Sequence, residues 1–114
     1  MARVVAFIPD LLFGSNVLAA LSGAGHEVEL VSEPAASGNK PDVLIVDLTA
    51  EPARRIELVR AMPRPNVRTL AFYSHVEADV RAQAEDAGFD MVVPRSRMAR
   101  EAPSLVDRLL AASG

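Results

Sequence analysis

The chain of 114 residues contains no cysteine and few aromatic residues, namely one tyrosine and four phenylalanines. The absence of cysteine excludes disulfides, a thiolate nucleophile and a cysteine-ligated zinc site. An aromatic content of 4% is too low for the stacking platform of a protein that binds single-stranded nucleic acid. The net charge of -3 provides no basic surface for a phosphate backbone. We therefore expect no nucleic-acid partner.

Long apolar runs are also absent. No run approaches the roughly 18 residues of a membrane-spanning helix, and the opening MARVVAFIPD lacks the length and cleavage site of a signal peptide. The chain is 50% hydrophobic and 24% charged, which is ordinary for a globular domain. We expect a soluble, cytoplasmic protein without membrane contact, folded as a single domain over residues 1–114.

Short apolar segments alternate with segments of helical periodicity along the whole chain. Strands are predicted at 3–8, 27–32, 42–48, 67–73 and 91–93, and helices at 15–23, 52–62, 77–87 and from 103 onward. This alternation predicts an α/β fold, a doubly wound parallel sheet of the flavodoxin-like class with strand order 2-1-3-4-5. The core is expected to include Val5, Phe7, Leu44, Val46 and Leu70.

The segment DVLIVDLT presents a physical problem, because a strand apolar enough to be buried on both faces ends on the carboxylate of Asp47. Burying an unpaired carboxylate costs several kcal/mol, so Asp47 needs a partner or an open strand end. In an open parallel sheet, functional sites lie at the carboxyl ends of the strands. This edge is predicted to carry five polar residues: Asp10, Asp47, Thr49, Ser74 and Arg95.

Four segments, FIPD, DVLIVDL, LAFYS and EDAGFDMVVPRS, together resemble the CheY-like receiver domain of two-component response regulators. The resemblance covers nearly the whole chain. It implies that Asp47 is the phosphoacceptor candidate and that Ser74 and Arg95 are candidate phosphate contacts. It also implies a magnesium site formed by Asp10, Asp47 and the carbonyl group of Thr49.

The chain departs from the receiver pattern at several positions. Pro9 replaces the first acidic residue, and Pro94 stands where the receiver pattern has a lysine that pairs with the phosphoryl group. Arg95 follows, and in an extended strand it would project to the other face. Residues 33–41, EPAASGNKP, are expected to form at most one helical turn, so the second helix of the pattern would be missing or reduced to that turn. With one acidic residue fewer, magnesium binding would be weak. Together these departures mean that the chain resembles an atypical receiver, a pseudo-receiver.

Three functions stay open. The first is a non-enzymatic, stand-alone pseudo-receiver that binds another signalling protein independently of phosphorylation. Its surface would be the 77–110 face, which could also form a homodimer. Five residues would supply apolar contacts there if they are exposed: Val76, Val80, Met91, Met98 and Leu105. The second is a weak phosphoacceptor that uses Asp47 in a phosphorelay. The third is a flavodoxin-like protein that binds a small ligand at the carboxyl edge of the sheet.

Overall fold

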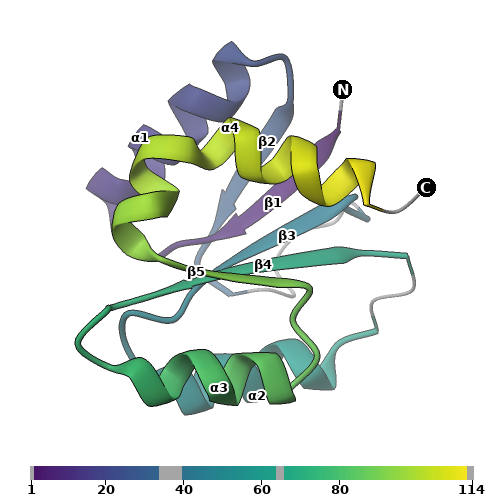
Figure 1. Cartoon of the computed structure of the whole chain (residues 1–114). Helices are drawn as coiled ribbons and strands as arrows, with labels where there is room; N and C mark the ends of the chain where they lie inside the picture. The colour runs from purple at the N-terminus through teal and green to yellow at the C-terminus, as the bar shows by residue number, and fades with distance from the viewer. Residues whose placement is uncertain (1, 34–39, 64–65, 113–114) are drawn as a thin grey trace.

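The computed structural model describes residues 2–33, 40–63 and 66–112. Within these ranges, helices and strands alternate along the chain (Figure 1). The elements are β1 (Arg3–Phe7), α1 (Leu11–Gly23), β2 (Glu27–Val31), β3 (Val43–Asp47), α2 (Pro52–Ala61), β4 (Arg68–Tyr73), α3 (Ala78–Asp86), β5 (Met91–Pro94) and α4 (Arg95–Ala111). None of the described helices is both long and apolar enough to cross a membrane.

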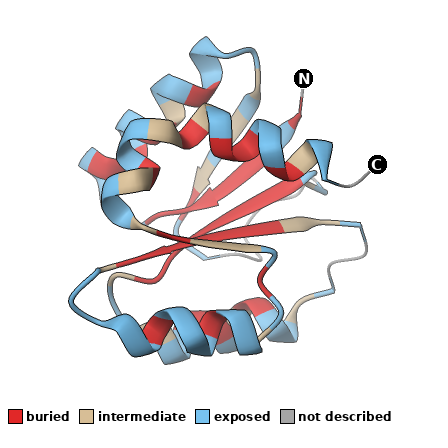
Figure 2. Ribbon diagram, viewed as in Figure 1, coloured by how far each residue is buried: buried red, intermediate tan, exposed pale blue. Residues whose placement is uncertain are grey.

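The strands form one parallel sheet in the order β2-β1-β3-β4-β5, which confirms the predicted topology. Helices α1 and α4 cover one face, and α2 and α3 cover the other (Figure 1). Every residue of β3 is buried, as expected for a central strand packed on both faces (Figure 2). The predicted core is confirmed, because five side chains are at most 1% exposed: Val5, Phe7, Leu44, Val46 and Leu70.

The first helix begins earlier than its periodicity predicts. The predicted helix 15–23 would use Ser15 as its N-cap. In the structure Asp10 is the N-cap of α1, and its carboxylate accepts a hydrogen bond from the backbone N–H of Phe13 at 3.1 Å. Aspartate and serine are about equally good caps, so local sequence does not separate the two. The periodicity begins late because Leu11 and Leu12, in the first turn, face solvent.

The second helix in chain order, α2, has ten residues. The expectation that the second helix is missing or only one turn long is therefore wrong. That expectation was placed on residues 33–41, of which 34–39 lie outside the described residues. Helix α2 itself confirms the helix predicted after Pro52. It is preceded by Glu51 in the left-handed conformation, with φ of 45°.

The last helix also begins earlier than predicted, at Arg95 directly after β5. Pro103 lies inside α4, and the helix is kinked at Glu101, where φ is -130° and ψ is 18°. A proline in a helix removes one hydrogen bond and its ring displaces the preceding turn, which accounts for the kink. Because Arg95 begins a helix, the chain bends after β5, and the projection to the opposite face that an extended strand would impose does not apply.

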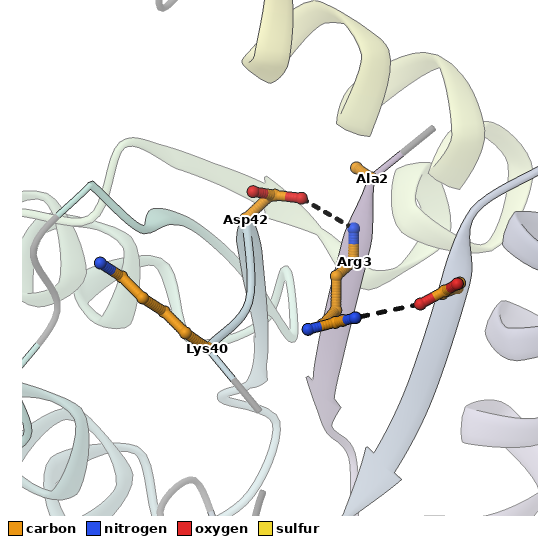
Figure 3. Close-up of a pocket in the computed structure, with 5 residues that line it drawn as sticks. Ala2, Arg3, Lys40 and Asp42 are labelled. Atoms are coloured by element: carbon orange, nitrogen blue, oxygen red, sulfur yellow. Dashed lines mark hydrogen bonds and ion pairs between the residues drawn. The ribbon is translucent and has the colours of Figure 1, made fainter. Parts of the chain in front are cut away.

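Aspartates tie the amino ends of neighbouring strands together. The carboxylate of Asp90 accepts hydrogen bonds from the N–H and hydroxyl of Thr69, at 2.8 and 3.1 Å, and the Asp90 N–H donates to that hydroxyl at 3.0 Å. Likewise, Asp42 accepts from the N–H of Arg3 at 2.9 Å, beside a surface cavity of about 280 Å³ (Figure 3). These bonds hold the strand register at the edge opposite the candidate site.

Candidate functional site

Asp47, the last residue of β3, is buried, with 3% of its surface exposed. One carboxylate oxygen, Oδ1, accepts hydrogen bonds from the N–H of Thr49 at 2.8 Å and from its hydroxyl at 2.5 Å. The other oxygen, Oδ2, lies 3.7 Å from Nη1 of Arg55. The central strand can therefore end on a buried carboxylate because Asp47 has a partner for each oxygen.

Arg55 is the partner that the sequence did not suggest. It lies one turn into α2 and is only 7% exposed. Its Nη1 donates to the carbonyl oxygen of Asp47 at 3.0 Å, and its guanidinium lies 5.6 Å from the ring centre of Phe7. Nη2 is 3.8 Å from a carboxylate oxygen of Glu51, while Nε has no hydrogen-bond partner. A cation from the protein's own chain thus stands beside Asp47.

Asp10 and Arg95 form a second, more exposed pair. Nη2 of Arg95 lies 3.9 Å from Oδ2 of Asp10, and the two side chains are 50% and 51% exposed. The Arg95 guanidinium also stacks on Phe13, at 4.1 Å from the ring centre. An ion pair this exposed contributes little to stability. The stacking nevertheless holds Arg95 against α1.

The structure thus places each predicted carboxylate next to a different arginine. Asp47 pairs with the buried Arg55, and Asp10 pairs with Arg95 while capping α1. Ser74, the remaining predicted phosphate contact, follows β4 at the same edge, where its carbonyl accepts the N–H of Glu77 at 2.9 Å in the turn before α3. The negative charges at this edge are therefore already compensated by side chains.

A magnesium ion at this edge would need free carboxylate oxygens, because it prefers octahedral oxygen ligands. Asp47 has both oxygens engaged, and the Arg55 guanidinium would repel a dication at that position. Among the described residues, no group of three or more histidine, aspartate or glutamate side chains could hold a metal ion. The side chains present therefore do not fit a magnesium site made by Asp10, Asp47 and Thr49.

One signal in the sequence could have pointed to Arg55. Helical spacing within the predicted helix 52–62 places Ile56, Val59 and Met62 on its inner face. In α2 the buried residues are Arg55, Ile56 and Val59, so the arginine lies on the inward stripe. This helix packs on a central strand that ends in aspartate. A charged residue beside the apolar stripe of such a helix is a candidate partner for the aspartate.

No protein-family model and no curated protein matches the sequence. Solved structures do match. A receiver protein from Burkholderia phymatum is 20% identical, with a TM-score of 0.81 over 97% of this chain and 96% of that chain. A response regulator from Thermotoga maritima is 15% identical, with a TM-score of 0.78 over 96% and 97%. The non-phosphorylated receiver domain of HemR from Leptospira biflexa is 15% identical, with a TM-score of 0.76 over 96% and 94%.

At these identities a structural match shows the fold alone. The matches span nearly the full length of both partners and agree with the parallel strand order of the sheet. The chain therefore has the CheY-like α/β fold of response-regulator receiver domains.

Proposed function

We propose that this protein is a receiver-fold signalling module whose output does not depend on phosphorylation. It would catalyse no reaction and would act by contact with another signalling protein. The observation that carries the proposal is the buried ion pair of Asp47 and Arg55, with 3.7 Å between Oδ2 and Nη1. The Asp47 side chain is 4% exposed and the Arg55 side chain is 8% exposed. This burial argues against a reactive, accessible carboxylate.

Access to Asp47 is the first physical obstacle to phosphorylation. A carboxylate that attacks a phosphoryl donor must bring a free oxygen into line with the phosphorus atom. Here Oδ1 holds two hydrogen bonds from Thr49, and Oδ2 faces Arg55. Attack through either oxygen would first require the loss of the partner on that oxygen, which leaves a buried polar or charged group unpaired and raises the barrier.

Charge is the second obstacle. The receiver resemblance assigns a lysine after the last strand to the phosphoryl group, and Pro94 stands at that position. Arg95 cannot take over this role without leaving Phe13 and Asp10. Loss of one such electrostatic group costs about 2.7–4 kcal/mol in other active sites, or roughly 100- to 1000-fold in rate.

A weak phosphoacceptor is the alternative, and the retained carboxylate at the end of β3 favours it. A response regulator from Burkholderia pseudomallei, 16% identical with a TM-score of 0.65, was solved with a phosphorylated aspartic acid and a calcium ion. That protein shows that the fold supports such chemistry. Asp47 of this chain would have to displace Arg55 before it could do the same.

Intact-mass spectrometry after treatment with acetyl phosphate and magnesium separates the two functions. We expect no added phosphoryl mass on the wild-type chain, and no change of melting temperature with magnesium or beryllium fluoride. Asp47→Asn is the acceptor control, and Arg55→Ala tests whether the guanidinium is the obstacle. A stoichiometric gain of one phosphoryl group that disappears in Asp47→Asn would overturn the proposal and establish the weak phosphoacceptor.

A further inference from the structure

The 77–110 face, predicted as a contact surface, keeps few of its predicted contacts. Val80, Met98 and Leu105 are core residues with exposed fractions of 2%, 0% and 0%, so they offer no contacts there. Val76 is 77% exposed and Met91 is half-buried. Three of the five predicted contact residues therefore lie in the core.

Buried charge is the more distinctive feature of this molecule. Within the described residues, Asp47 and Arg55 are the only charged residues that are buried. Burial of a charge is costly unless the charge is paired, and each of these two is the partner of the other. Arginine stays protonated in proteins. The carboxyl end of β3 therefore carries a permanent positive charge that belongs to the chain itself.

Three oxygen atoms surround the Arg55 guanidinium. The carbonyl oxygen and Oδ2 of Asp47 lie 3.0 and 3.7 Å from Nη1, and a carboxylate oxygen of Glu51 lies 3.8 Å from Nη2. Carboxylate and backbone carbonyl oxygens are also the ligands that magnesium and calcium take from proteins. Arg55 thus gathers a set of oxygens that is typical of a cation site.

We infer that Arg55 takes the place of a divalent cation at the carboxyl end of β3, so that this edge of the sheet needs no metal ion to compensate Asp47. The inference rests on the proposed function and deepens it, since it names what holds that module in one state. The positive charge comes from α2 and not from solution. Chelators and changes in magnesium concentration should therefore leave the edge unaltered.

The distance between Asp47 and Arg55 explains why the guanidinium and a metal ion exclude each other. A magnesium ion binds a carboxylate oxygen at about 2.1 Å. Since Oδ2 of Asp47 is 3.7 Å from Nη1 of Arg55, an ion on that oxygen would lie no more than about 6 Å from the nitrogen. At that distance, repulsion between a dication and a unit positive charge weakens binding about tenfold even in water, and more in a buried setting.

A single substitution should reverse this replacement. Removal of the guanidinium frees Oδ2 and the carbonyl oxygen of Asp47. Asp10 stands at the same edge, and its ion pair with Arg95 is half exposed and weak. Magnesium usually takes one or two carboxylates from a protein and completes its shell with water. A variant without the guanidinium should therefore gain a weak site for a divalent cation.

Titration with manganese tests the inference, because manganese favours the same oxygen ligands as magnesium. Electron paramagnetic resonance measures binding, since bound manganese loses the sharp signal of the free ion. Arg55→Met removes the charge but keeps much of the bulk, whereas Arg55→Lys keeps a positive charge. Arg54→Met is the matched control, because Arg54 is an exposed arginine of the same helix. Asp47→Asn/Arg55→Met removes the carboxylate as well.

The wild-type chain, Arg55→Lys and Arg54→Met should bind no manganese up to about 1 mM, the range of weak cation sites. Arg55→Met should bind one ion at least about tenfold more tightly than the wild type does, and the double variant should lose that gain. Magnesium should raise the melting temperature of Arg55→Met alone. Circular dichroism checks folding. If Arg55→Met does not fold, Arg55→Gln replaces it, since its amide can still donate to the Asp47 carbonyl.

Four results would overturn the inference. They are manganese binding by the wild-type chain, a folded neutral variant of Arg55 that gains no site, an equal gain in Arg55→Lys, and an equal gain in Arg54→Met. The third would show that bulk and not charge excludes the ion, and the fourth would place the ion elsewhere on the chain. None of these measurements uses a phosphoryl donor, so this inference and the proposed function can fail separately.

Discussion

Replacement of Arg55 by alanine tests the central electrostatic feature of the structure. The substitution removes the guanidinium from beside Asp47 and leaves a carboxylate that is 3% exposed. Breaking a buried ion pair by removing one partner costs about 3–5 kcal/mol, because the remaining charge is uncompensated. Asp47 would keep both hydrogen bonds from Thr49. The expected loss is therefore at the lower end, about 3 kcal/mol of unfolding free energy.

Arg54 provides a matched control one residue away. Its Nη2 lies 3.0 Å from a carboxylate oxygen of Glu33, but the side chains are 51% and 48% exposed. An exposed pair of this kind contributes about 1 kcal/mol or less. Arg54→Ala removes the same side chain from the same helix, so the difference between the two variants isolates the effect of burial.

Urea denaturation monitored by circular dichroism gives both unfolding free energies. A loss of about 3 kcal/mol should also lower the melting temperature by roughly 10–15 °C for a domain of this size. The double variant Asp47→Asn/Arg55→Met should be more stable than Arg55→Ala, because no buried charge is left alone. If Arg55→Ala costs less than about 1 kcal/mol, or no more than Arg54→Ala, the ion pair does not compensate a buried charge.

Two further substitutions test the packing and the amino edge of the sheet. Leu44→Ala removes a fully buried side chain of β3 and should cost about 2–5 kcal/mol in chemical denaturation, from lost transfer energy and the cavity left behind; a cost below about 1 kcal/mol would contradict its central position. Asp90→Ala leaves the Thr69 N–H and hydroxyl without their acceptor and should cost about 1–3 kcal/mol. Unchanged stability in that variant would mean that water replaces the carboxylate.

The strand order and the core could be predicted because burial on both faces leaves a strong local signal. The run Val43 to Val46 is apolar at every position, which is typical of a central strand in a covered parallel sheet. The same reasoning located Asp47, since a charge at the end of such a run has to be placed at an edge or paired. The topology then brought Asp10 to the same edge of the sheet without further information.

Partners and helix ends were harder to predict. The pairing of Arg55 with Asp47 joins a strand to the helix that follows it, and a periodicity argument treats an arginine as an outward residue. The start of α4 was missed because proline favours the first turn of a helix. Pro103 does occupy the beginning of a helical segment, the one after the kink at Glu101. The preference of proline for the first helical turn therefore predicted the segment from Pro103, but it did not predict the turns from Arg95 to the kink.

The pairing of α1 with α4 across one face of the sheet has a consequence for the order in which the chain is made. Synthesis runs at about 5–20 residues per second, so the residues between the end of α1 and the end of α4 take roughly 4–18 s to add. During that interval Phe13, Val17 and Leu21 have no partner helix, although β2 can already be present. The inward side chains of this uncharged segment therefore wait for their partner helix until the end of the chain is made.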